Sequence, residues 1–208
     1  MSAGAELSQA TRRRHARVEA VERNALLTHA AAAVLTILLL AEGVTLLDMG
    51  GLLRPHMFIG LMLIPPVLLK LASTGYRFAR YYTGSAAAAP SPGTRPLLRA
   101  LAPVLVASTA AILASGVWLL LIGHHSDFAL AVHKVAFIVW SGAFGLHFLA
   151  YLPAAARSLA SAVRPNRSGA RIGGSRMAAA LVLSSAGAGL AVALSLLARI
   201  AEWQGYRF

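Results

Sequence analysis

Four histidines in apolar stretches are the residues of this chain best suited to chemistry. The segment HKVAFIVWSGAFGLH holds His133 and His147, fourteen residues apart. Two more, His29 and His56, lie in earlier apolar stretches. Ionisable groups at membrane depth are rare and tend to be functional, and an imidazole can bind a metal or relay a proton. What these four do depends on the elements that carry them.

The composition is that of an integral membrane protein. Of 208 residues, 58% are hydrophobic and 12% charged, and the apolar residues fall in long runs. A membrane-spanning helix needs about 20 mostly apolar residues. Pro65-Pro66 predicts a kink or a wide turn in the second such run. We expect five spanning helices, at about 26–47, 55–73, 100–122, 129–152 and 177–198.

The basic residues, which give the chain a net charge of +12, are concentrated in alternate connections between the predicted helices. They cluster before the first helix, between the second and third, and between the fourth and fifth, whereas EGVTLLDMGGLLRP and IGHHSDF together hold one arginine. Positive charge in alternate loops predicts a cytoplasmic N-terminus and an external C-terminus, with the protein in the plasma (inner) membrane. Membrane lipid is then the expected partner of the basic loops, and nucleic acid is not expected.

In this orientation the histidines fall at two depths. His29 and His147 lie toward the cytoplasm, and His56 and His133 lie near the outer surface. Fourteen helical residues return to within about 40° of the starting direction and rise about 21 Å. This spacing suits two stacked haems, each held between the fourth helix and one other. The chain has no cysteine, which excludes thiolate metal sites and covalently attached haem.

Other residues fit the same two levels. Gly43 lies fourteen residues after the first histidine, where a missing side chain would admit a macrocycle. Lys70 lies fourteen after the second, at the inner level, where it could meet a haem propionate. Arg54 and Lys134 flank the outer histidines and could serve the outer propionates. Small residues such as Gly43 are also common at membrane helix interfaces, purely for close packing.

The histidine pattern resembles the four-helix di-haem cytochrome b superfamily, which includes cytochrome b subunits of bacterial dehydrogenases and hydrogenases and ferric-reductase-like cytochromes. The match covers about residues 25–153 and depends on four histidines and topology. The resemblance implies bis-histidyl b haems that carry electrons between a quinone or cytoplasmic donor and an external partner, as a subunit of a membrane oxidoreductase. The chain departs from several members by taking ligands from its first, second and fourth helices.

The predicted fold is an all-α membrane protein: a four-helix transmembrane bundle that binds two b haems, plus a fifth transmembrane helix. No nucleotide-binding loop or soluble redox domain is found, so a redox partner protein or a quinone, the latter a further candidate cofactor, must exchange the electrons. The predicted regions are a basic cytoplasmic segment (1–24), the bundle (25–153), a basic cytoplasmic linker (154–176), and the fifth helix with an outer tail (177–208).

The fifth helix is rich in small residues, including Ala178 and Gly189, which suit close contact inside the bundle or in an oligomer. Trp203 and Tyr206, which follow it, are expected to anchor the chain at the outer membrane interface.

A second hypothesis is a cofactor-free membrane anchor or assembly subunit, whose histidines serve helix packing or proton relay. Glu42 and Asp48, near the outer end of the first helix, favour it because a carboxylate beside a histidine can relay protons.

Overall fold

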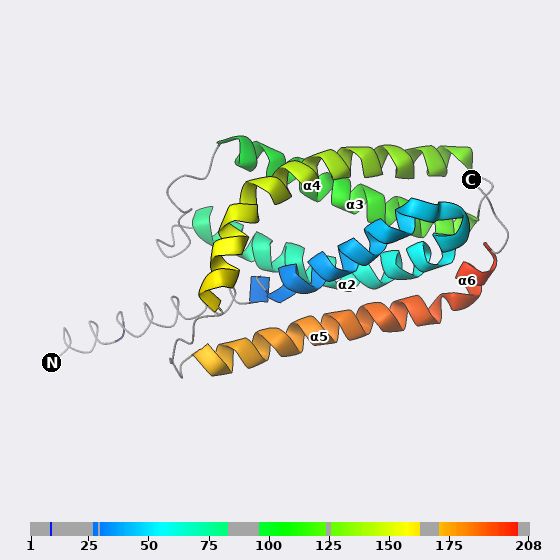
Figure 1. Ribbon diagram of the computed structural model, residues 1–208. Coiled ribbons are helices and arrows are strands. Elements are labelled where there is room, and N and C mark those ends of the chain that lie inside the picture. Colours follow the sequence, from blue (N-terminus) through cyan, green and yellow to red (C-terminus); the bar gives the residue numbers. More distant parts are fainter. Residues whose placement is uncertain are drawn as a thin grey trace.

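The described part of the chain is almost entirely helical and contains no strand. The computed structural model describes Gln9 and residues 27–28, 30–82, 96–123, 126–162 and 171–203. A first helical limb (30–45) is followed by η1 (Leu46–Asp48), α2 (Met49–Tyr82), α3 (Pro96–Ile122), α4 (Asp127–Ala162), α5 (Arg171–Ser195) and α6 (Leu197–Ala201). The long helices run side by side along one axis, with α3 packed mainly on α4 and α2 on α5 (Figure 1).

Four helical stretches are long and apolar enough to cross a membrane, which indicates a multi-pass membrane protein. They are Ala30–Tyr76, Ala100–Ile122, Asp127–Pro153 and Arg176–Ser195. The first has 47 residues and would measure about 70 Å if straight, roughly twice the thickness of a bilayer's hydrocarbon core. It is instead folded in two.

The chain reverses its direction in this stretch at the short 3-10 turn η1. The first limb returns along α2, so that the Thr28 hydroxyl donates to Ser73 Oγ at 3.2 Å. Leu35 and Leu38 of the limb pack with Leu63 of α2 in a small apolar core. The loop predicted between the first and second helices is absent, because helix continues on both sides of a three-residue turn.

The prolines of α2 lie inside a continuous helix, and the predicted wide turn is absent. Because proline has no N–H, Pro65 and Pro66 leave the carbonyls of Leu61 and Met62 without their usual helical donors. Gly189 of α5 packs directly against the Met62 carbonyl, so closely that a Cβ at this position would overlap the oxygen. The α5 helix thus lies where the prolines open the hydrogen-bond ladder of α2.

One stripe of α5 and α6 faces the rest of the protein. Ala178, Val182 and Ala193 are buried along it, and Ile200 and Trp203 complete it beyond α5. The small residues of this stripe, Ala178, Gly189 and Ala193, therefore serve contact within the chain. Trp203 is 6% exposed and belongs to a core with α2, α3, α4 and α5, so its predicted role as an interfacial anchor is wrong. Tyr206 lies outside the described residues.

A connection of only four residues, which we call the α3–α4 turn, separates Ile122 of α3 from Asp127 of α4. Gly123 adopts a positive φ of 78° and its N–H donates to the Leu119 carbonyl, which ends α3. Ser126 Oγ then accepts the N–H of Ala129 and begins α4. Because this turn is short, residues at equal distances before and after it lie at the same level of the hairpin.

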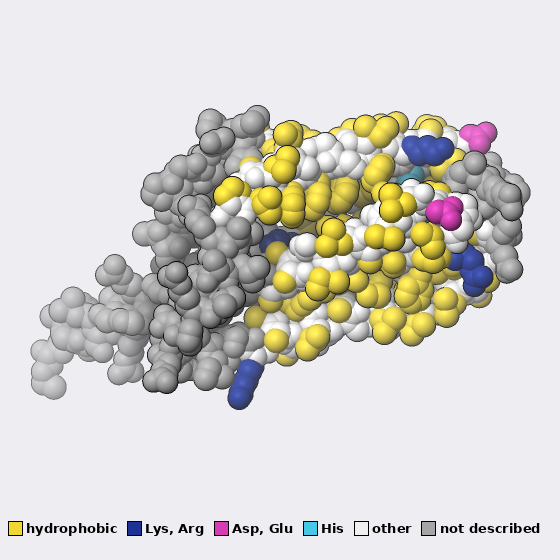
Figure 2. Space-filling view, viewed as in Figure 1, with side chains coloured by type: hydrophobic (Ala, Val, Ile, Leu, Met, Phe, Trp, Pro, Cys, Tyr) yellow, Lys and Arg dark blue, Asp and Glu magenta, His cyan; other side chains and the backbone are white. Residues whose placement is uncertain are grey.

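The surface of the described helices is dominated by apolar side chains, as Figure 2 shows. Ile37, Phe128, Ile138 and Leu183 are each about two-thirds exposed, which water would penalise and lipid would not. The region predicted as a basic linker (154–176) begins and ends in helix, because α4 extends to Ala162 and α5 begins at Arg171. The predicted 1–24 segment lies outside the described residues except for Gln9.

Candidate functional site

The structure brings together two of the four sequence-predicted histidines. His56 from α2 and His133 from α4 face each other with ring centres 6.4 Å apart and ring planes at 79°. We call these two residues the outer histidine pair, after the side of the membrane on which the sequence predicts them. Their common level follows from the hairpin formed by the first limb and α2 and from the turn between α3 and α4, which place both near the same end of the bundle.

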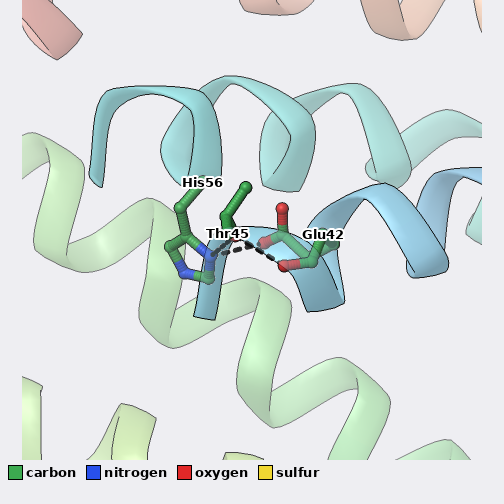
Figure 3. A network of polar contacts seen from close by, with 3 residues as sticks. All are labelled: Glu42, Thr45 and His56. Atoms are coloured by element: carbon green, nitrogen blue, oxygen red, sulfur yellow. Dashed lines mark hydrogen bonds and ion pairs between the residues drawn. The ribbon is translucent and has the colours of Figure 1, made fainter. Parts of the chain in front are cut away.

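Two groups of the first limb hold the His56 ring (Figure 3). Glu42 Oε1 lies 2.9 Å from His56 Nδ1, and Thr45 Oγ1 lies 3.1 Å from the same nitrogen. The two side chains reach His56 because η1 turns the chain back within a few residues. Both the imidazole and the carboxylate are largely buried, with side-chain exposures of 18% and 15%.

These contacts assign the proton on His56. The Thr45 hydroxyl donates its only hydrogen to the Glu42 carbonyl, so towards the imidazole it can act only as an acceptor. The Glu42 carboxylate is likewise an acceptor. His56 Nδ1 therefore carries a hydrogen, and in the neutral imidazole Nε2 has its lone pair for another partner.

His133 is held in the same way by α3. Ser115 Oγ lies 3.0 Å from His133 Nδ1, while the Ser115 hydroxyl is 3.1 Å from the Ile112 carbonyl, to which it donates. The serine oxygen therefore accepts from Nδ1–H, and the Nε2 lone pair is available. Both rings of the outer histidine pair are fixed in the tautomer that a metal ligand coordinating through Nε2 requires.

Glycines make room around the outer histidine pair. A Cβ on Gly116 of α3 would lie 3.3 Å from His133 Cε1, so its absence lets the ring pack against the helix. A Cβ on Gly60 of α2 would lie 3.5 Å from Glu42 Oε1. Gly43 is exposed and has no atom within 4 Å of a built Cβ, and its role as a notch for a macrocycle stays a prediction. Figure 2 shows the surface hollowed between α4 and the first limb, with histidine atoms visible inside.

The inner level is described in part. His147 of α4 packs against Tyr151, with ring centres 4.7 Å apart. Lys70 of α2 lies within electrostatic range of His147 and donates from Nζ to the Thr28 carbonyl at 2.8 Å. Lys70 therefore lies near both Thr28 and His147, and its role toward a propionate stays a prediction. His29 lies outside the described residues.

The remaining predicted residues lie at the outer end. Arg54 and Lys134 both have exposed side chains, and no described contact tests their role toward a cofactor. Asp48 is exposed, and its Oδ1 accepts the Gly51 N–H at 3.0 Å, which gives it a turn-capping role apart from the histidines.

Sequence reasoning missed the hydrogen-bond partners of the outer histidine pair. Ser115 lies eight residues before Gly123, and His133 lies seven after Ser126, so the symmetry of a tight helical hairpin could have placed them at one level. Thr45 and Glu42 needed knowledge that η1 is a turn of only three residues. Glu42 was expected beside a histidine, without an indication of which one.

Within the described residues, no group of three or more His, Cys, Asp or Glu side chains is arranged to hold a metal ion. No family model, curated protein or solved structure matches the chain.

Proposed function

We propose that this chain carries electrons across a membrane through two b haems, each bound by two histidines. His56 and His133 would hold the outer haem, and His29 and His147 the inner one. When bound, haem iron supplies reversible one-electron chemistry. The chain's own residues orient the imidazoles, provide apolar surroundings and exclude water from the path between the two levels.

The observation that carries the proposal is the state of the outer histidine pair. Metal-bound histidines usually donate their second ring N–H to a carboxylate, carbonyl or water, which fixes the tautomer and strengthens the ligand. Both Nδ1 atoms are engaged in this manner, by Glu42 and Thr45 for one ring and by Ser115 for the other.

The spacing of the rings supports the same reading. Imidazole nitrogens bind metals at about 2 Å, and the ring centre lies about 1 Å beyond the nitrogen, so two rings on opposite sides of one ion would have centres separated by roughly 6 Å. The observed separation is 6.4 Å. The residues present therefore fit an iron with two axial imidazoles.

The proposed topology has five crossings. The first limb and α2 both run from η1 to the level of the Thr28–Ser73 hydrogen bond, so the 47-residue stretch would cross twice. The three other apolar helices would supply one crossing each. We place the N-terminus in the cytoplasm from the basic loops. A quinone or cytoplasmic donor and an external redox partner would exchange electrons with the haems. An oligomer, if formed through α5, would use the surfaces of α5 that do not face α2.

The test is optical. Purified protein is expected to show a Soret band and, by pyridine haemochrome assay, two haems per chain. His133→Ala should lower this count to one, because it removes one ligand of the outer pair. Leu146→Ala, an exposed position on the same helix, is the matched control and should retain two. Purified, folded protein without a Soret band would contradict the proposal.

A second candidate is a cofactor-free proton relay or anchor. It is favoured by the Glu42–His56 hydrogen bond and by Glu42 Oε2, which is buried and accepts no hydrogen bond from the described residues. Of the two carboxylates expected to act in it, only Glu42 lies beside a histidine. A colourless protein that conducts protons in vesicles, and loses this on Glu42→Gln substitution, would support this candidate over the haem relay.

A further inference from the structure

Glu42 gives the outer level a charge that the inner level does not share. Its Oε1 lies 2.9 Å from His56 Nδ1 in a setting where the carboxylate is only 15% exposed. Oε2 is buried with no hydrogen-bond partner among the described residues. Water therefore screens this negative charge poorly, and its effect on the neighbouring imidazole is larger than that of a surface carboxylate.

The two rings of the outer pair are not equivalent. His133 donates to the neutral hydroxyl of Ser115, whereas His56 donates to a carboxylate. A carboxylate acceptor makes an imidazole a more basic ligand than a hydroxyl does. A more basic ligand stabilises ferric over ferrous iron, and so does a nearby negative charge.

The inner level carries the opposite charge. The Lys70 ammonium lies within electrostatic range of His147, and its bond to the Thr28 carbonyl holds it at this level. A cation favours the reduced, more electron-rich form of a redox centre. Glu42 at the outer level and Lys70 at the inner level thus act on midpoint potential in opposite directions.

We propose that Glu42 is a positioning residue that acts through His56 to hold the midpoint potential of the outer haem below that of the inner haem. This inference rests on the proposed function. It assigns a specific role to the one carboxylate that the first limb buries against α2. With the outer haem at the lower potential, electron transfer from the outer to the inner level is the downhill direction in the absence of a membrane potential.

The experiment is a redox titration of the purified haem protein. Two waves are expected, and the one missing from His133→Ala belongs to the outer haem. Glu42→Gln keeps the size of the side chain and an acceptor oxygen but removes the charge, so the outer wave should move to higher potential while the inner wave stays in place. Lys70→Met should move the inner wave to lower potential.

Asp48→Asn is the matched control, because Asp48 is an exposed carboxylate six residues further along the chain, and it should move neither wave. Glu42→Asp retains the charge and should leave the outer wave lower than Glu42→Gln does. Equal outer waves in these two variants, or a Glu42→Gln shift shared by both waves, would overturn the role of Glu42 while leaving the relay intact. A native protein without haem would overturn the relay and this inference together.

Discussion

At the scale of single residues, the orientation of the outer histidine pair depends on hydroxyl groups that have already donated their hydrogen. Ser115 and Thr45 each donate to a carbonyl three residues earlier in their own helix. A hydroxyl used in this way is left as an acceptor, and it selects one tautomer of the ring it meets. These two hydroxyls thus orient a neighbouring histidine in addition to bonding a carbonyl of their own helix.

Substitution of Ser115 by alanine tests this point. Removing a hydrogen-bond partner of a metal-bound histidine typically costs about 10-fold to 100-fold in affinity, so Ser115→Ala should release the outer haem more readily while retaining the inner one. The measurement is haem loss to an excess of apomyoglobin. Ser108→Ala is the control, because Ser108 is equally buried and also donates three residues back, to Leu105, with no histidine beside it. Equal haem loss in the two variants would argue against tautomer control by Ser115.

At the scale of elements, two close contacts position the histidines. The turn η1 brings Glu42 to His56, and the α3–α4 turn brings Ser115 to His133. Apolar run lengths predicted that helices exist, because burial of backbone polar groups in lipid requires them. They did not predict η1 or the helical start of α2, because GGLLRP, which follows η1, has the composition of a loop, whereas Leu53 within it packs in a core with residues of α3 and α6. They also did not predict that α2 would continue through Pro65-Pro66, where contact with Gly189 accompanies the opened ladder.

Gly189 offers a test of how α5 is held. Gly189→Leu should force α5 away from α2, because the neighbouring atom is a backbone carbonyl that cannot rotate aside. Overpacking typically costs about 1–3 kcal/mol, measured here as a lower free energy of unfolding in mixed micelles. Gly187→Leu, two residues away with nothing within 4 Å of a built Cβ, should unfold like the native protein. Equal destabilisation of both variants would show that α5 is not held at this contact.

At the scale of the whole molecule, hydropathy and charge predicted a multi-helix membrane protein and the level shared by His56 and His133. These features follow from the bilayer, which fixes helix length and direction. The hydrogen-bond partners of the pair depend on turns of a few residues and on helix rotation, which hydropathy does not report. Trp203 shows the same limit, because an aromatic residue near a helix end suits both a membrane interface and a core, and only the packing of α6 decides for the core.

The arrangement of the two levels leads to a prediction for the intact protein in a membrane. His133 and His147 lie on one continuous helix, α4, about 21 Å apart along its axis. Haems at both levels would form a path from one face to the other.

In sealed vesicles with a reductant inside and an impermeant oxidant outside, or the reverse, the native protein should speed electron crossing. His147→Ala, which should lack the inner haem, should reduce the rate to that of protein-free vesicles, whereas Leu146→Ala should not. If His147→Ala conducts as fast as the native protein, electrons do not cross through the inner level. Comparing the two loading directions also tests the charge asymmetry, because a lower outer potential predicts faster crossing when the reductant is on the outer side.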